Sequence, residues 1–182
     1  MHAFLALSRA VDRLNFVVGR AVSWLVLLVV LISAGNAISR KLFAVSSNAW
    51  LEVQWYLFSA IFLLAAGYTL LQGEHVKVDI VFSRLSRRTQ LWIEIVGTIA
   101  FLLPMCVIAI VLTWPVVAGK YISQETSGNA GGLILWPVWA LIPIGFFLLA
   151  LQGLSELIKR IAVLQGRIPD IIEPTEAETA VL

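Results

Sequence analysis

The stretch that decides the fold is Ile95–Gly119, IVGTIAFLLPMCVIAIVLTWPVVAG, which contains no Asp, Glu, Lys, Arg or His. About 20 apolar residues, rising 1.5 Å each, cover the hydrocarbon core of a bilayer as a helix, so this stretch can cross a membrane. Three further stretches share these properties: Ala21–Ser39, Val53–Gly73 and Gly128–Ser155. The sequence therefore predicts an all-α membrane protein with four transmembrane helices.

The lack of titratable residues inside these stretches also bears on function. Acids, bases and histidines within a membrane usually mark ion paths, proton relays and substrate sites. A four-span chain without them is a poor candidate to move a polar solute alone. We therefore expect a subunit of a larger assembly.

Composition leaves little room for anything besides the membrane domain. The chain has 182 residues, of which 60% are hydrophobic, so we predict one domain over residues 1–166, with spans at about 17–39, 49–72, 91–116 and 134–158. Residues 167–182 form an acidic tail that we expect to be disordered. We interpret the first span as uncleaved, because its apolar run is long for a signal peptide; cleavage after Ala37 is the alternative.

The distribution of basic residues predicts the orientation in the membrane. Loops rich in Lys and Arg stay in the cytoplasm. Ten such residues flank the two termini and the middle loop, against three on the other side, Arg40, Lys41 and Lys120. Both termini are therefore expected in the cytoplasm. The middle loop should include a short amphipathic helix, within residues 76–90, that lies along the lipid headgroups.

Tryptophans show a second pattern, because most of them fall near the predicted outer ends of the spans. Indole rings favour the membrane interface. An aromatic belt is the simplest interpretation, and packing against a partner protein is the alternative. The five residues are Trp50, Trp55, Trp114, Trp136 and Trp139.

Three polar groups interrupt the apolar pattern. Glu52 and Gln54 open the second span, where a carboxylate is stabilised by the helix N-terminus and an amide can bond another helix, in this chain or in a partner. A second group, Glu74, His75 and Asp79 with Arg84, follows that span and suits salt bridges better than a metal. The third group, Glu125 and Ser127, lies in the second outer loop, as a turn element or a docking point.

Other functions find little support. The net charge of +2 is too small and scattered to suggest nucleic acid. A haem carrier needs axial histidines inside the bundle, whereas His2 and His75 lie outside the spans. A small autonomous exporter needs a membrane carboxylate, for which Glu94 and Glu156 are the nearest candidates. We therefore predict neither catalytic activity nor a cofactor.

These residues resemble the small membrane subunit of tripartite ATP-independent periplasmic (TRAP) transporters, the DctQ-like family, over about residues 13–166. The most specific string is Gly73-Glu74-His75-Val76-x-Val78-Asp79-Ile80. The other matching features are Glu52-x-Gln54-x-Tyr56, Arg84-Leu85-Ser86, Pro104, Glu125-x-Ser127, Trp136, Pro143-x-Gly145 and Gln152-Gly153.

The resemblance implies a small inner-membrane subunit beside a large DctM-like subunit that carries an organic solute, usually with sodium. A periplasmic binding protein delivers that solute. On this basis we expect Trp50, Glu52, Gln54 and Trp55 to contact the large subunit or its lipids. We expect Glu74, His75, Asp79 and Arg84 to shape a cytoplasmic elbow, and Glu125 and Ser127 to dock the binding protein.

Overall fold

The structure, a computed structural model, describes residues 2–43, 47–73 and 85–169. Its helices are α1 (His2–Phe43), α2 (Asn48–Leu71), α4 (Arg87–Gly97), the π-helical turn η1 (Thr98–Leu102), α5 (Leu103–Ser123) and α6 (Trp136–Leu164). Since α4, η1 and α5 run on as one helix, four helices are long and apolar enough to cross a membrane. The prediction of an all-α protein with four helices of membrane-spanning length is confirmed, and no strand forms within the described ranges.

Three of the four long helices extend beyond the predicted spans, and α2 matches its span to within one residue. α1 begins at His2, about 15 residues before the predicted start of the first span, and has 42 residues, which makes it about 63 Å long. The third helix begins at Arg87, so the end of the predicted interfacial helix is its first turn. Most of that interfacial helix lies outside the described residues. These differences arise because hydropathy marks where the apolar run ends, whereas a helix continues wherever its backbone hydrogen bonds can form.

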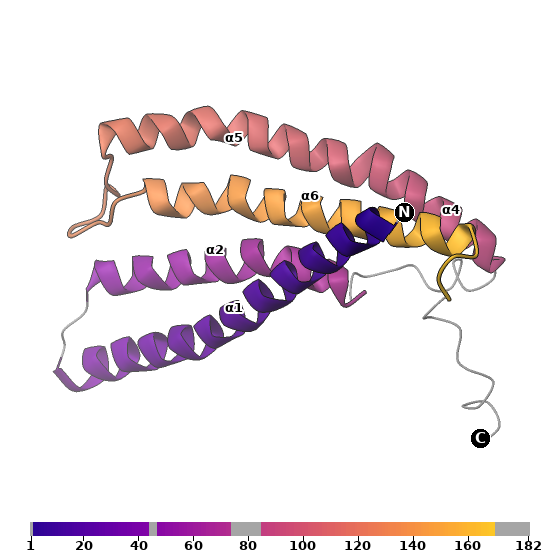
Figure 1. Cartoon of the computed structure of the whole chain (residues 1–182). Coiled ribbons are helices and arrows are strands. Elements are labelled where there is room, and N and C mark those ends of the chain that lie inside the picture. The colour runs from indigo at the N-terminus through magenta and orange to yellow at the C-terminus, as the bar shows by residue number, and fades with distance from the viewer. Residues whose placement is uncertain (1, 44–46, 74–84, 170–182) are drawn as a thin grey trace, which may run out of the picture.

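The four long helices are arranged with α6 at the centre. α2 packs between α1 and α6, and α5 packs on α6 (Figure 1). α1 starts where α6 ends, which we call the terminal end, and a loop joins α5 to α6 at the opposite, hairpin end. α1 also crosses α6 near the terminal end. Because α5 is held mainly by α6, broad faces of the assembly stay uncovered.

Close contacts between helices use small residues, as is common in membranes. A Cβ atom added to Gly145 of α6 would lie 2.6 Å from the carbonyl oxygen of Leu63 in α2. At Gly67 of α2, an added Cβ would lie 2.2 Å from Oδ1 of Asn15 in α1. Large apolar side chains point outward instead: Trp55, for example, is 74% exposed. The protein buries small and polar groups and exposes large apolar ones, as suits a lipid or protein environment.

Pro104 coincides with the one irregular part of the third helix. Proline lacks the N–H that would bond to the carbonyl of Ala100. The chain adopts the π-helical turn η1 immediately before it, in Thr98–Leu102. Gly153 of α6 lies against this turn, since its added Cβ would lie 2.6 Å from Leu102. The helix therefore accommodates Pro104 through a π-helical turn at a helix contact.

Candidate partner-binding surfaces

Glu52 fastens α2 to the loop that joins α5 to α6. One carboxylate oxygen accepts a hydrogen bond from the Asn129 side-chain amide at 2.7 Å, and the other accepts one from the backbone N–H of Leu133 at 2.7 Å. One turn further along α2, the Tyr56 hydroxyl donates to the carbonyl of Ile134 at 2.9 Å. We call these contacts the Glu52 clamp. Sequence reasoning placed Glu52 at the N-terminus of its helix but did not identify the hairpin as its partner.

The loop itself is a folded hairpin that contains both predicted docking residues. The backbone N–H of Ser127 donates to the carbonyl of Leu133, and the Ser127 hydroxyl accepts from the Asn129 side chain at 3.2 Å. Glu125 forms an ion pair with Lys120 at 3.0 Å, and its side chain remains 52% exposed. The ammonium group of Lys120 also lies 5.1 Å from the ring centroid of Trp139. Glu125 is therefore the carboxylate that this hairpin presents outward.

The four residues expected to contact a partner near the start of α2 do not share one surface. Gln54 accepts a hydrogen bond from Ser33 of α1 at 2.9 Å. Trp50 lines a hollow between α1 and α2 that also includes Ile32 and Gly35. Glu52 lies in its clamp, and Trp55, whose side chain is 74% exposed, lines a hollow beside Glu52 and lies on an open face of α2. Among the four, Trp55 is the best placed to meet another protein.

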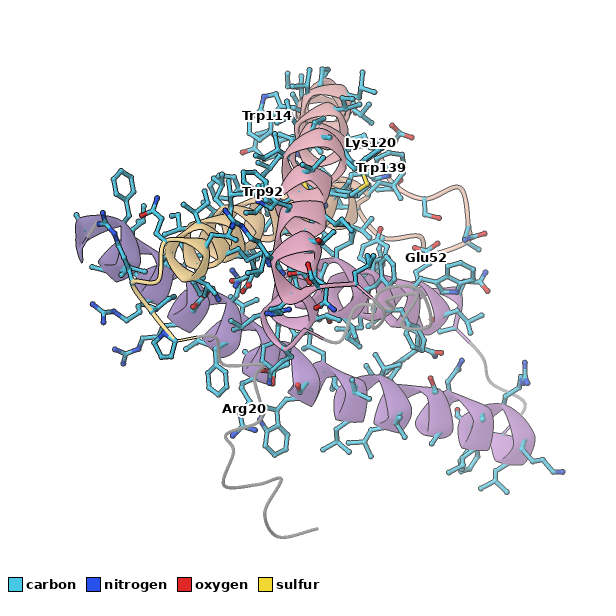
Figure 2. All side chains as sticks on the ribbon, turned by 90° about the vertical axis from the view of Figure 1, so that its right-hand side faces the viewer. Arg20, Glu52, Trp92, Trp114, Lys120 and Trp139 are labelled. Atoms are coloured by element: carbon cyan, nitrogen blue, oxygen red, sulfur yellow. The ribbon has the colours of Figure 1, made fainter. Side chains whose placement is uncertain are left out.

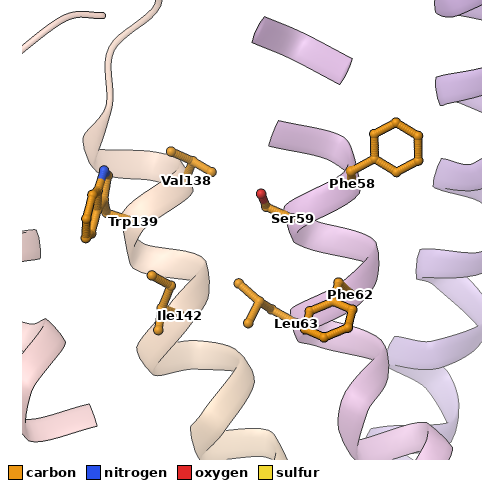
Figure 3. Close-up of a pocket in the computed structure, with 7 residues that line it drawn as sticks. All are labelled: Phe58, Ser59, Phe62, Leu63, Val138, Trp139 and Ile142. Atoms are coloured by element: carbon orange, nitrogen blue, oxygen red, sulfur yellow. The ribbon is translucent and has the colours of Figure 1, made fainter. Parts of the chain in front are cut away.

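That open face carries aromatic residues along one stripe of α2. Trp55, Phe58 and Phe62 follow one another at helical spacing and are 74%, 58% and 80% exposed. Beside them lies an open hollow of about 490 Å³ between α2 and α6, in which Ser59 and Leu63 face the α6 residues (Figure 3). Its α6 wall consists of Val138, Trp139 and Ile142. We call the stripe and this hollow the aromatic face.

A buried polar cluster joins α1 to α6 near the terminal end. Asn15 and Gln152 are fully buried, and the amide of Asn15 donates to Oε1 of Gln152 at 3.0 Å. Asp12 accepts from Ser155 at 2.7 Å and pairs with Lys159 at 3.2 Å. Sequence reasoning did not identify this cluster. The signal was available, because Ser8 and Asn15 are seven residues apart and Val22 and Val29 continue the buried stripe at that spacing.

The carboxylates that an exporter would need are paired in this structure. Glu94 lies 2.8 Å from Arg160, and Glu156 lies 2.5 Å from Lys159.

No group of three or more His, Cys, Asp or Glu side chains that could hold a metal occurs in the described part of the chain. Glu74, His75, Asp79 and Arg84, the predicted elbow, lie outside the described residues.

Comparison with known proteins gives one finding. A family model described as "Tripartite ATP-independent periplasmic transporters, DctQ component" matches residues 29–163. A search of curated proteins and a search of solved structures each returned no significant match. The family match covers about three quarters of the chain and includes the Glu52 clamp, the aromatic face and the α6 side of the polar cluster.

Proposed function

Since the chain belongs to the DctQ family, the small membrane component of tripartite ATP-independent periplasmic (TRAP) transporters, we propose that it is a non-catalytic scaffold subunit. It supports a large DctM-like subunit in the uptake of an organic acid that a periplasmic binding protein delivers. An ion gradient, in our proposal sodium, drives the uptake. The family match is the observation that carries this function.

The arrangement of the helices supports a scaffold role. A transporter that works alone needs polar groups along a path through the membrane. Here the polar cluster links α1 to α6, and Glu94 and Glu156 are paired with Arg160 and Lys159. The autonomous-exporter alternative therefore gains no support from these carboxylates. The wide uncovered faces, in contrast, suit a protein that packs against a larger membrane partner.

We propose that the large subunit packs on the aromatic face. A helix of the partner can insert side chains into the hollow between α2 and α6, beside Phe62 and Trp139. Exposed aromatic residues around a pocket are typical of the residues that dominate binding energy. Trp55 extends the contact toward the hairpin end.

We place the hairpin end in the periplasm and the terminal end in the cytoplasm of a bacterial inner-membrane protein. The count of Lys and Arg residues supports this orientation. The hairpin then faces the binding protein, with Glu125 exposed and Ser127 ordered by its backbone and hydroxyl hydrogen bonds. The Glu52 clamp keeps the hairpin in one position, which lowers the entropy cost of docking.

The first experiment is co-purification of the tagged chain from native membranes, with identification of bound proteins by mass. A large polytopic subunit in fixed ratio is expected. A chain that purifies alone, and transports solute when reconstituted alone, would refute the scaffold role and favour the exporter.

A matched pair of variants tests the aromatic face. Phe62→Ala removes a ring that is 80% exposed on this face, and Phe101→Ala removes one that is 75% exposed on η1. We expect Phe62→Ala to weaken binding of the large subunit by about thirtyfold, and so to lower its co-purified yield, because an aromatic anchor buried in an interface contributes about 2 kcal/mol. Phe101→Ala should have little effect. Equal losses from the two variants would show that the large subunit does not select the aromatic face.

A further inference from the structure

The outward side of α1 carries arginines along one line. The buried side is marked by Ser8, Asn15 and Val22, which are seven residues apart. Arg13 and Arg20 each follow one of these buried residues by five positions, which places both arginines about 140° around the helix axis from the buried side. The remaining member of the line, Arg9, precedes Arg13 by one turn, and all three arginines are exposed. We call Arg9, Arg13 and Arg20 the arginine stripe.

Arg20 marks a boundary of the hydrocarbon core. The charge-free run that follows it, residues 21–39, is about 28 Å long as a helix, close to the core thickness of about 30 Å. Arg40, at the other end of the run, marks the opposite boundary. The arginine stripe therefore leads outward from the core boundary, through the depth at which lipid phosphates lie, over about 17 Å.

The stripe has no anionic partner within the part of the chain that the structure describes. The guanidinium of Arg20 lies 5.7 Å from the ring centroid of Phe16, a contact that leaves its N–H groups available. Figure 2 shows Arg20 pointing away from the other helices. A cation at the edge of the membrane core attracts an anion, and Arg binds phosphate in a bidentate manner.

A hollow along α1 begins at Arg20 and continues into the apolar run. It has a volume of about 660 Å³, and its lining residues all come from α1: Arg20, Ser23, Trp24, Val26, Leu27 and Val30. The chemistry changes along it from a cation, through an indole ring that is 72% exposed, to aliphatic side chains. A phospholipid has the same order, with a phosphate, then an interfacial glycerol region, then an acyl chain.

We propose that the arginine stripe and this hollow bind one anionic phospholipid of the leaflet at the terminal end. Arg20 holds the phosphate, Arg9 and Arg13 attract the headgroup charge, and an acyl chain lies along Leu27 and Val30. This inference goes beyond the proposed function, because it concerns a lipid site on α1 that is separate from the aromatic face.

The test is native mass spectrometry of the full-length chain in detergent. The chain is titrated with phosphatidylglycerol, which is anionic, and with phosphatidylcholine of the same acyl chains. The wild type should prefer phosphatidylglycerol. Arg20→Gln should weaken phosphatidylglycerol binding about fivefold, the contribution of one basic residue near an anionic leaflet, and leave phosphatidylcholine binding unchanged. Arg20→Lys should keep most of the preference.

Two control variants separate this site from general charge attraction. Arg40→Gln removes the same charge from the other end of α1 and should leave the preference intact. Leu27→Trp fills the hollow and should weaken the binding of both lipids to the same extent. Equal lipid affinities in the wild type, an unchanged Arg20→Gln variant, or an equal loss in Arg40→Gln would each overturn the proposal. An Arg20→Gln variant that binds lipid normally but no longer co-purifies with the large subunit would also overturn the proposal, because the arginine stripe would then contact that subunit.

Discussion

At the scale of single residues, the Glu52 clamp shows how one carboxylate serves a membrane protein without lying in its core. Both of its oxygens accept hydrogen bonds from the hairpin, 77 and 81 residues away along the chain. The sequence indicated that Glu52 would sit in the opening turn of α2. It could not indicate the hairpin as its partner, because helical periodicity says nothing about which loop folds over a helix end.

The clamp gives a prediction about local order. Glu52→Ala removes both acceptors and leaves the N–H of Leu133 without its partner. We expect hydrogen exchange at the Leu133 amide to accelerate on the order of tenfold, since a bond to a charged acceptor is lost. Glu52→Gln, which keeps one acceptor oxygen, should have a smaller effect.

Glu125→Ala is the matched control for the clamp. It removes a carboxylate from the same end of the molecule, but one whose ion pair with Lys120 is exposed and contributes little. Exchange at Leu133 should therefore stay near the wild-type rate in this variant. The clamp would lose its assigned role if Glu125→Ala accelerated exchange as much as Glu52→Ala does.

At the scale of helices, four motif residues of α6 that belong to the family resemblance prove to be packing positions. Pro143, Gly145, Gln152 and Gly153 of α6 are all buried. Each alone is a weak signal in a sequence, because glycine and proline are common in membrane helices. The length of the apolar runs predicted that these helices exist, but not which helices they contact. The polar cluster was missed for this reason, since Asn15 and Gln152 are 137 residues apart in the chain.

The junction of α1, α2 and α6 allows a direct test of such a contact. Gly67→Ala would place its methyl group about 2.2 Å from Oδ1 of Asn15, so one of them must move. We expect a loss of about 1–3 kcal/mol in the free energy of unfolding, as is usual for overpacking. The measurement is denaturant unfolding in mixed micelles. Gly97→Ala, where an added Cβ meets nothing within 4 Å, should not destabilise the protein.

A double variant tests whether the methyl group added at position 67 clashes with Asn15. Asn15→Ala removes the oxygen that an alanine at position 67 would strike, so Asn15→Ala with Gly67→Ala should lose less stability than the sum of the two single changes. Contacting residues typically show a coupling of about 0.5–3 kcal/mol. Strict additivity would mean that the methyl group is accommodated against Leu148 instead, whose carbonyl oxygen lies 3.2 Å from the added Cβ.

At the scale of the whole molecule, the distribution of burial explains why this fold calls for a partner. α6 alone contacts α1, α2 and α5, and it contains more buried residues than any other helix that the structure describes. The outer sides of the other helices carry exposed Trp, Phe, Val and Leu side chains. Lipid can cover such surfaces, and we propose that a helix of the large subunit covers the hollow of the aromatic face. Composition predicted a subunit, whereas locating a docking face required the packed helices.

The orientation of the whole molecule can be tested through its single cysteine. Cys106 is fully buried, so it should react slowly with an impermeant maleimide, and Cys106→Ala gives a clean background. In that background, Gly128→Cys reports the hairpin end and Ala10→Cys reports the terminal end; both positions are exposed or half-buried. If the hairpin end is periplasmic, only Gly128→Cys is labelled in spheroplasts, and Ala10→Cys needs permeabilised membranes. The reverse pattern would place the hairpin in the cytoplasm, away from any periplasmic binding protein, and would remove Glu125 and Ser127 as its docking residues.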